Sequence, residues 1–215
     1  MLVRMNQDLG GAVWGWVAAV EGNPHAGDMN DAPSRRDELY AELEKLPPNV
    51  TGEIIGGELY VSPRPAIRHA RAASRLGIEL GGPFDRGRGG PGGWVILFEP
   101  ELHLDQDVLV PDVSGWRRER MPELPDVVGV TLAPDWVCEV LSPSTAALDR
   151  ARKMAVYARE GVRHLWLVDP VPRTLEVYRL EQGGWRVLPT HVDNNRVRAE
   201  PFEALELELG ALWER

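Results

Sequence analysis

Short apolar runs bounded by turn residues recur along the second half of the chain and predict buried strands. They lie at residues 94–98, 108–113, 136–141 and 164–168. Side chains alternate between the faces of a strand, and in 136–141 both faces are apolar except at Glu139, which is typical of a strand covered on both sides. A helical segment at 146–159, capped by Ser144 or Thr145, joins this strand to 164–168, so we expect a parallel pair with a right-handed connection.

The pattern before residue 94 predicts a short helix, a hairpin and a longer helix. Residues 35–45 carry leucines at helical spacing, and Ser34 can cap the start of this helix. Two apolar runs flank Gly56-Gly57 and predict a β-hairpin. Apolar residues recur every three or four positions from 66 to 80, which indicates a helix packed on the core.

The segments between these elements are predicted as follows. Residues 81–93 hold seven glycines and two prolines, so we expect a mobile loop that stops the preceding helix. Residues 101–104 continue the strand at 94–98 or pair with it, and residues 114–134 form a long connection punctuated by prolines.

Two further elements are expected near the C-terminus. Residues 174–180 and 185–189 form a hairpin around a Gln-Gly-Gly turn. Residues 202–209 alternate apolar and acidic side chains, which suits an edge strand with one solvated face.

Length and composition favour one domain. The chain has 215 residues, of which 43% are hydrophobic, enough for a single well-buried core over residues 34–215. We expect residues 1–33 to be a poorly ordered extension: a leader, an artefact of the assigned start codon or a partner-binding tail. Its apolar stretch at 12–20 is too short to span a membrane and lacks the basic start and cleavage site of a signal peptide.

Charge, cysteine content and motifs exclude several classes of function. The net charge of −9 argues against nucleic-acid binding through a broad basic surface, so any such contact must be local. The single cysteine, Cys138, lies in an apolar run, where it predicts a small buried side chain in a reducing, cytoplasmic compartment. No P-loop Gly-Lys-Ser/Thr is present, so we expect no nucleotide cofactor.

Asp112 and Glu139 are carboxylates in strand runs where a hydrocarbon side chain is expected. A buried carboxylate without a partner costs several kcal/mol or takes up a proton. Two explanations fit: a divalent cation held between the two acids, or an arginine or hydrogen-bond network for each. On the following helix Asp149, Lys153 and Tyr157 are four apart and share a face, which is either a solvated ion pair or a lysine that reaches the Glu139 strand.

These residues, in this order and spacing, resemble the Uma-type (Uma-two) family of predicted restriction endonucleases, in the PD-(D/E)xK nuclease superfamily. The resemblance spans roughly residues 35–190. It is carried by Gly57-Glu58-Leu59-Tyr60, His69, Pro111-Asp112, Glu139-Val140-Leu141-Ser142-Pro143-Ser144-Thr145, Asp149, Lys153, Tyr157, Gly161 and Trp166-Leu167-Val168-Asp169-Pro170.

The resemblance implies an α/β, restriction-endonuclease-like fold: a central mixed β-sheet flanked by helices, with an N-terminal helix and β-hairpin. It implies a DNA endonuclease dependent on Mg²⁺, with Mn²⁺ as the alternative, and Asp112 and Glu139 as the metal ligands. The superfamily's usual lysine is replaced by Leu141, and its catalytic role passes to Lys153. The accessory residues expected near this site are Glu58, His69 and Tyr157.

His69 would complete a metal shell or contact phosphate; alternatively, it is a helix cap or surface residue. We also expect a homodimer, because cutting both strands of a duplex needs two sites.

Two other functions compete with the nuclease. A catalytically inactive DNA- or protein-binding module would keep the scaffold, and Leu141 and the acidic balance favour it. Hydrolysis of sugars by a carboxylate pair would need an aromatic-lined groove. Five of the eight tryptophans, however, lie in or beside strand-like runs and are more simply core residues: Trp94, Trp116, Trp136, Trp166 and Trp185.

Overall fold

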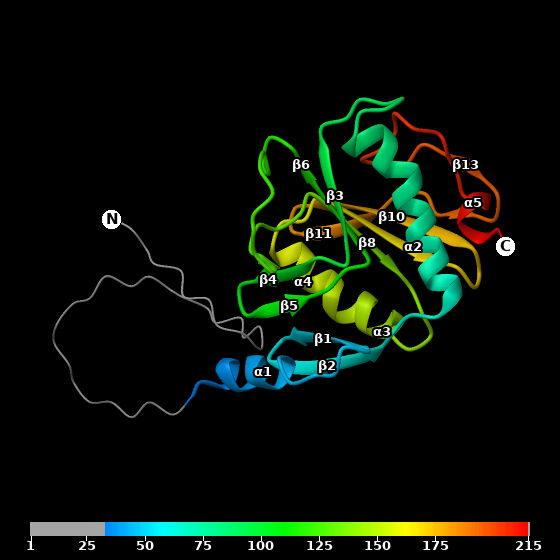
Figure 1. Ribbon diagram of the computed structural model, residues 1–215. Coiled ribbons are helices and arrows are strands. Elements are labelled where there is room, and N and C mark those ends of the chain that lie inside the picture. The colour runs from blue at the N-terminus through cyan, green and yellow to red at the C-terminus, as the bar shows by residue number, and fades with distance from the viewer. Residues whose placement is uncertain (1–32, 215) are drawn as a thin grey trace, which may run out of the picture. The chain divides into compact units, whose positions relative to one another are not determined.

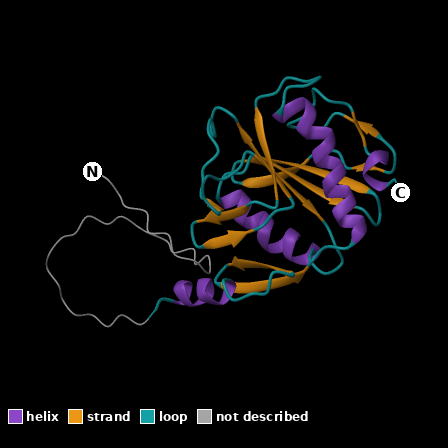
Figure 2. Ribbon diagram, viewed as in Figure 1, coloured by secondary structure: helices purple, strands orange, loops and turns teal. Residues whose placement is uncertain are grey.

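A computed structural model describes residues 33–214, which hold a large mixed sheet as their central feature (Figures 1 and 2). The order of its main strands is β11-β10-β9-β8-β6-β3, and β12 adds to β10. β8 and β9 are parallel, as predicted, and the other pairs are antiparallel. The strands are β3 (Trp94–Phe98), β6 (Val113–Arg117), β8 (Trp136–Val140), β9 (His164–Asp169), β10 (Thr174–Glu181), β11 (Gly184–Val187) and β12 (His191–Val192).

A second sheet has the order β2-β1-β5-β4-β7. Its strands are β1 (Val50–Ile55), β2 (Glu58–Pro63), β4 (Glu101–Leu104), β5 (Asp107–Leu109) and β7 (Gly129–Val130). The hairpin predicted around Gly56-Gly57 is confirmed as β1 and β2. The prediction that residues 101–104 continue or pair with β3 is wrong, because β4 pairs with β5 and β7 in this other sheet.

The longer helical regions are α1 (Arg35–Leu43), α2 (Ile67–Leu80) and an interrupted helix made of α3 (Ala146–Leu148), η2 (Asp149–Lys153) and α4 (Met154–Arg159). The predicted cap of α1 is present, since Ser34 and Asp37 exchange hydrogen bonds in a capping box. The middle of the third helix is a π-helical turn that the sequence did not predict. Neither Ser144 nor Thr145 caps its start by a side chain.

Each face of the large sheet packs on its own apolar cluster. Trp136, Cys138 and Val140 of β8 pack with α2 on one face. Val137 and Leu141 pack with α4 on the other face. The alternation predicted for this strand is therefore confirmed, and Glu139 points to the α4 side. Four of the five tryptophans predicted to be core are at most 1% exposed, and Trp185 is partly buried.

The prediction of a simple loop at 81–93 is wrong at its start. Residues Gly81–Asp85 (η1) continue α2 as a π-helical turn, and the side chain of Phe84 is buried. Phe84 lies with its ring centroid 4.6 Å from that of Phe202. Burial of this aromatic side chain outweighs the tendency of the neighbouring glycines and proline to end the helix.

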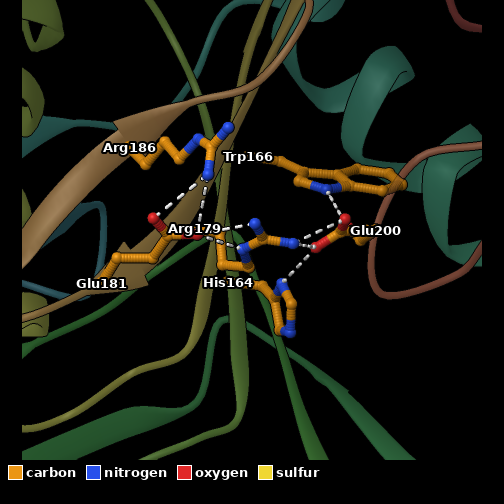
Figure 3. A network of polar contacts seen from close by, with 6 residues as sticks. All are labelled: His164, Trp166, Arg179, Glu181, Arg186 and Glu200. Atoms are coloured by element: carbon orange, nitrogen blue, oxygen red, sulfur yellow. Dashed lines mark hydrogen bonds and ion pairs between the residues drawn. The ribbon is translucent and has the colours of Figure 1, made fainter.

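The edge strand predicted at 202–209 is also wrong. Only β14 (Leu207–Glu208) is extended there, paired with β13 (Arg196–Val197) and followed by α5 (Gly210–Trp213). Phe202 is 2% exposed because it lies among the core aromatic rings. A polar network joins the segment around Glu200 to the large sheet (Figure 3). Arg179 donates hydrogen bonds to Glu181 and Glu200, and the indole N–H of Trp166 donates to the carbonyl of Glu200.

Two other observations concern the ends of the chain and membranes. The prediction for residues 1–33 lies outside the described residues except for Pro33. The part of the chain that the structure describes contains no helix with the length and apolar character needed to cross a membrane.

Candidate active site

Asp112 lies directly before β6, so the single strand predicted over 108–113 is wrong: β5 ends at Leu109 in the second sheet and β6 begins at Val113 in the large sheet. The irregularity that Pro111 predicts at this point is present, since Pro111 and Asp112 lie between the two strands. One carboxylate oxygen, Oδ2, accepts a hydrogen bond from the N–H of Val140 at 2.7 Å. The other, Oδ1, lies 3.3 Å from Nε2 of His69. The hydrogen bond from Val140 therefore holds the Asp112 carboxylate against the end of β8.

Glu139 projects from the middle of the sheet into a buried polar cluster. Its Oε1 accepts a hydrogen bond from the hydroxyl of Tyr157 at 2.6 Å and forms an ion pair with Nζ of Lys153 at 2.8 Å. Among residues 33–214 no arginine pairs with it, and its cationic partner is the lysine on the next helix. Of the two explanations for a buried acid at this position, a network of polar partners is therefore present at Oε1 of Glu139.

Lys153 bonds to three carboxylates, all nearly buried. Besides Glu139, its Nζ lies 3.0 Å from Oε1 of Glu53 and 3.5 Å from Oδ1 of Asp149. The helical face predicted for Asp149, Lys153 and Tyr157 does face the Glu139 strand, and the reading as a solvated ion pair is wrong, because Lys153 is 3% exposed. The π-helical turn over 149–153 widens the backbone at this point, a feature often found at functional sites.

Glu53 is the acid of the cluster that sequence reasoning missed. It lies on β1, where it is 6% exposed and also accepts from the N–H of Val110 at 2.8 Å. Glu58, the acid expected from this hairpin, does not line the site: it lies at the exposed start of β2, where Tyr60 donates to it. The sequence did indicate that Glu53 could be buried, because it directly precedes the apolar pair Ile54-Ile55 in the same predicted strand.

His69 lies in the first turn of α2 with its ring against Asp112. Burial lowers the pKa of its imidazole, but the hydrogen bond and charge of Asp112 outweigh burial, so the pKa lies above the usual 6.5. The cap at the start of α2 is Ala66, and the His69 side chain is only 11% exposed. The alternative of a cap or surface histidine is therefore wrong.

The cluster holds more negative than positive charge. Four carboxylates, on Asp112, Glu53, Glu139 and Asp149, surround one lysine and one histidine. Burial is the main cause that raises the pKa of Glu139 well above its usual value, and repulsion from the other acids adds to it, while Lys153 lowers it. The pKa of Asp149 is raised for the same reasons.

Lys153 remains a cation in this setting. Burial lowers the pKa of its amine, but attraction to Glu139 and Glu53 is stronger in sum and raises the pKa well above 10.5. The amine therefore carries a fixed positive charge at neutral pH and does not act as a proton acceptor.

A cavity of about 330 Å³ opens onto this cluster. Asp112, Glu139 and Lys153 all line it, and its rim carries Arg64 and the hydroxyl-bearing residues Ser142, Ser144 and Thr145. Within residues 33–214, no three side chains of histidine, cysteine, aspartate or glutamate form a ready metal-binding group. A cation here would have to use fewer side chains together with main-chain or water oxygens.

Comparison with known proteins identifies the chain's relatives. The model of the Uma2 family, described as "Putative restriction endonuclease", matches residues 37–210. The chain belongs to the Uma2 family. A search of curated proteins finds no match.

The same fold is seen in a solved structure described as "a putative nuclease belonging to DUF820" from Anabaena variabilis. This structure superposes with a TM-score of 0.66 at 23% identity, covering 81% of the present chain and 96% of the other. The predicted fold, a mixed sheet flanked by helices with an N-terminal helix and hairpin, is thereby confirmed.

Proposed function

We propose that this Uma2-family protein is a divalent-cation-dependent endonuclease that hydrolyses DNA phosphodiester bonds. In this proposal Asp112 and Glu139 hold the cation, and Lys153 is the catalytic lysine. Mg²⁺ is the expected cation, and Mn²⁺, which favours the same oxygen ligands, is the alternative. A homodimer remains a prediction.

The observation that carries the proposal is the convergence of Asp112, Glu139 and Lys153 on one cavity. The two acids come from the neighbouring strand ends of β6 and β8, and the lysine comes from the helix after β8. Leu141, at the position of the superfamily's usual lysine, points into the apolar cluster instead. Lys153 reaches the same glutamate from the helix, as expected for a lysine that has moved.

The residues present fit a divalent cation. The cluster has an excess of negative charge, and Glu139 and Asp149 have raised pKa values, so an added cation would relieve repulsion. Glu139 engages Tyr157 and Lys153 through Oε1 only, which leaves Oε2 for another partner. Mg²⁺ commonly binds one or two carboxylates and keeps several waters, so a site with two acids suffices.

Each side chain then has a distinct task. A bound cation would lower the pKa of a water and polarise the scissile phosphate. Lys153 holds Glu139 in position and offsets the negative charge that develops on the phosphate. Tyr157 helps to orient Glu139 through the same oxygen, and His69 orients Asp112.

The rim of the cavity suits a phosphate backbone. The hydroxyl of Ser142 lies 2.9 Å from that of Ser144 and 3.0 Å from that of Thr145. Hydroxyl groups and arginines are common phosphate ligands, and Arg64, which also lines the cavity, is exposed. This local contact agrees with a chain whose overall charge is negative.

A supercoiled-plasmid nicking assay with and without Mg²⁺ tests the proposal. Wild type and Glu58→Gln, which changes an acid outside the cavity, are expected to nick DNA only with the cation. Asp112→Ala and Lys153→Ala are expected to be inactive. Nicking that survives both substitutions would point to a contaminating nuclease and overturn the proposal. Binding of DNA without any nicking would favour the alternative, a catalytically inactive binding module. The three carboxylates that already neutralise Lys153 are consistent with that alternative.

Mg²⁺ is expected to raise the thermal stability of the protein. A ligand that binds only the folded state at 100 times its Kd stabilises it by about 2.7 kcal/mol. For a chain of this size that corresponds to roughly 5–10 °C in Tm. The measurement is a melting curve by circular dichroism with Mg²⁺ or EDTA. Glu58→Gln should keep the shift, whereas a shift that persists in Asp112→Asn would place the cation elsewhere.

Tyr157→Phe is expected to lower the cleavage rate by about 10- to 100-fold, because Glu139 loses one of the two donors that orient it. The folded state should lose about 1–2 kcal/mol with the hydrogen bond. The matched control is Tyr178→Phe, which removes a hydroxyl that donates to Glu176 on β10 and makes no contact with Glu139. Equal cleavage rates for the two variants would show that the Tyr157 hydroxyl has no role in the site.

A further inference from the structure

A second, smaller cavity of about 280 Å³ adjoins the candidate active site. Its lining includes Ala70 and Ala73 of α2 and Phe98 at the end of β3. The cavities share His69 and Asp112, so the two spaces meet at the proposed cation ligand. We call this space the α2 groove.

Phe98 is held in place although half of its surface is exposed. It is 50% exposed, yet the tip of its ring rests on the backbone of α2 at Gly77, where an added Cβ would lie 1.7 Å from Cζ of Phe98. Glycine inside a helix costs about 1 kcal/mol relative to alanine, so Gly77 is a costly choice that makes room for this ring. The next residue, Glu99, has a φ of 44°, and its N–H donates to the carbonyl of Asp112 at 3.1 Å. These contacts fix an exposed aromatic ring beside Asp112.

The surroundings of the α2 groove favour a ligand that carries phosphate. Arg64 and Arg68 are exposed at the start of α2. Besides Asp112, the groove is lined by the acid Glu99, which forms an ion pair with Arg64 at 3.7 Å that offsets its charge. An apolar floor next to arginines and a catalytic carboxylate matches a nucleotide, whose flat base is joined to a charged phosphate.

We propose that the α2 groove is a nucleobase subsite, in which the ring of Phe98 stacks on the base of a nucleotide next to the scissile phosphate. The proposal rests on the nuclease function proposed above and specifies its substrate. The groove is near the small end of the range of ligand pockets, about 300–1,000 Å³, which suits one base. A base can enter it only after leaving its stack in a duplex, so single-stranded, bulged or frayed DNA is the preferred substrate.

Binding of a short single-stranded oligonucleotide tests the subsite without requiring cleavage. The oligonucleotide carries 2-aminopurine, whose fluorescence falls when it stacks on an aromatic ring, and binding is followed in EDTA and in Ca²⁺. Wild type is expected to bind it with quenching, and to bind a fully paired duplex of the same sequence less tightly. Phe98→Ala should bind the single strand about ten-fold or more weakly and without quenching, whereas Phe98→Tyr keeps the ring and the affinity.

Two further variants separate stacking from folding. Gly77→Ala must displace the ring of Phe98 and is expected to lose the quenching as Phe98→Ala does. Ile78→Ala removes an exposed side chain from the same helix outside the groove and should behave as wild type. Melting curves report whether each variant is folded.

The outcomes distinguish this inference from the nuclease proposal. If wild type nicks plasmid and Phe98→Ala binds the single strand as wild type does, the subsite is wrong and the nuclease stands. If wild type binds the single strand through Phe98 but no substrate is cut, the nuclease is wrong and a base-binding groove stands. Absence of quenching in wild type overturns the subsite directly.

Discussion

Replacing Lys153 with methionine is expected to lower the free energy of unfolding by about 3–5 kcal/mol at neutral pH, because buried carboxylates lose their cation. The amine of Lys153 bonds to Glu139, Glu53 and Asp149, and all four side chains are nearly inaccessible to solvent. Methionine is similarly long and apolar, so it keeps most of the packing and removes mainly the charge. Urea unfolding followed by circular dichroism measures the difference.

The loss of stability should shrink as the pH falls from 8 to 5. The pKa of Glu139 is raised, chiefly by burial, so on acidification the folded state takes up a proton before the unfolded state does. Protonation of Glu139 therefore favours the folded state below this raised pKa. In Lys153→Met no amine lowers the pKa of Glu139, so acidification stabilises this variant more than it stabilises wild type. Arg152→Met, an exposed cation on the same helix, is the control. Equal urea midpoints for the two variants would mean that the acids of the cluster do not depend on Lys153.

The strand β8 and the helix after it were predictable because their signals are local. Alternation alone assigned Glu139 to a face shared with Val137 and Leu141, and helical spacing gave Lys153 its direction. The strand–helix–strand unit has one favoured handedness, which places the helix over the sheet. The pairing of Glu139 with Lys153 therefore followed from neighbours in sequence.

Glu53 could not be assigned to the cluster in this way. It enters because β1 pairs with β5, where Ile54 lies opposite Val108, and no local pattern states which distant strand a hairpin will join. The position of Phe202 is similar, since its neighbours alternate like a strand while its ring is drawn into the aromatic core. In both cases tertiary burial outweighs local propensity.

Replacing Glu139 with glutamine is expected to abolish most cleavage while leaving the protein as stable as wild type or more stable at pH 8. Glutamine keeps the shape and an oxygen that can accept from Tyr157 and Lys153, but it removes one charge from a cluster with excess negative charge. Since Glu139 has a raised pKa, ionised Glu139 destabilises the fold above that pKa, and glutamine avoids this cost. Loss of a cation ligand should lower the cleavage rate by at least about 10²–10³-fold.

Glu139→Gln is expected to lose cleavage without losing stability, and this combination distinguishes a role in function from a role in folding. A residue kept only for structure would lose stability when replaced, whereas a residue kept for chemistry is often destabilising where it stands. Plasmid nicking measures the cleavage rate of Glu139→Gln at pH 8, and urea unfolding measures its stability. Glu58→Gln is the control, because Glu139 lines the cavity and Glu58 does not. A stable Glu139→Gln that still nicks DNA at the wild-type rate would remove Glu139 from the catalytic set. An inactive variant that is also several kcal/mol less stable would make its carboxylate a structural partner of Lys153 and not a cation ligand.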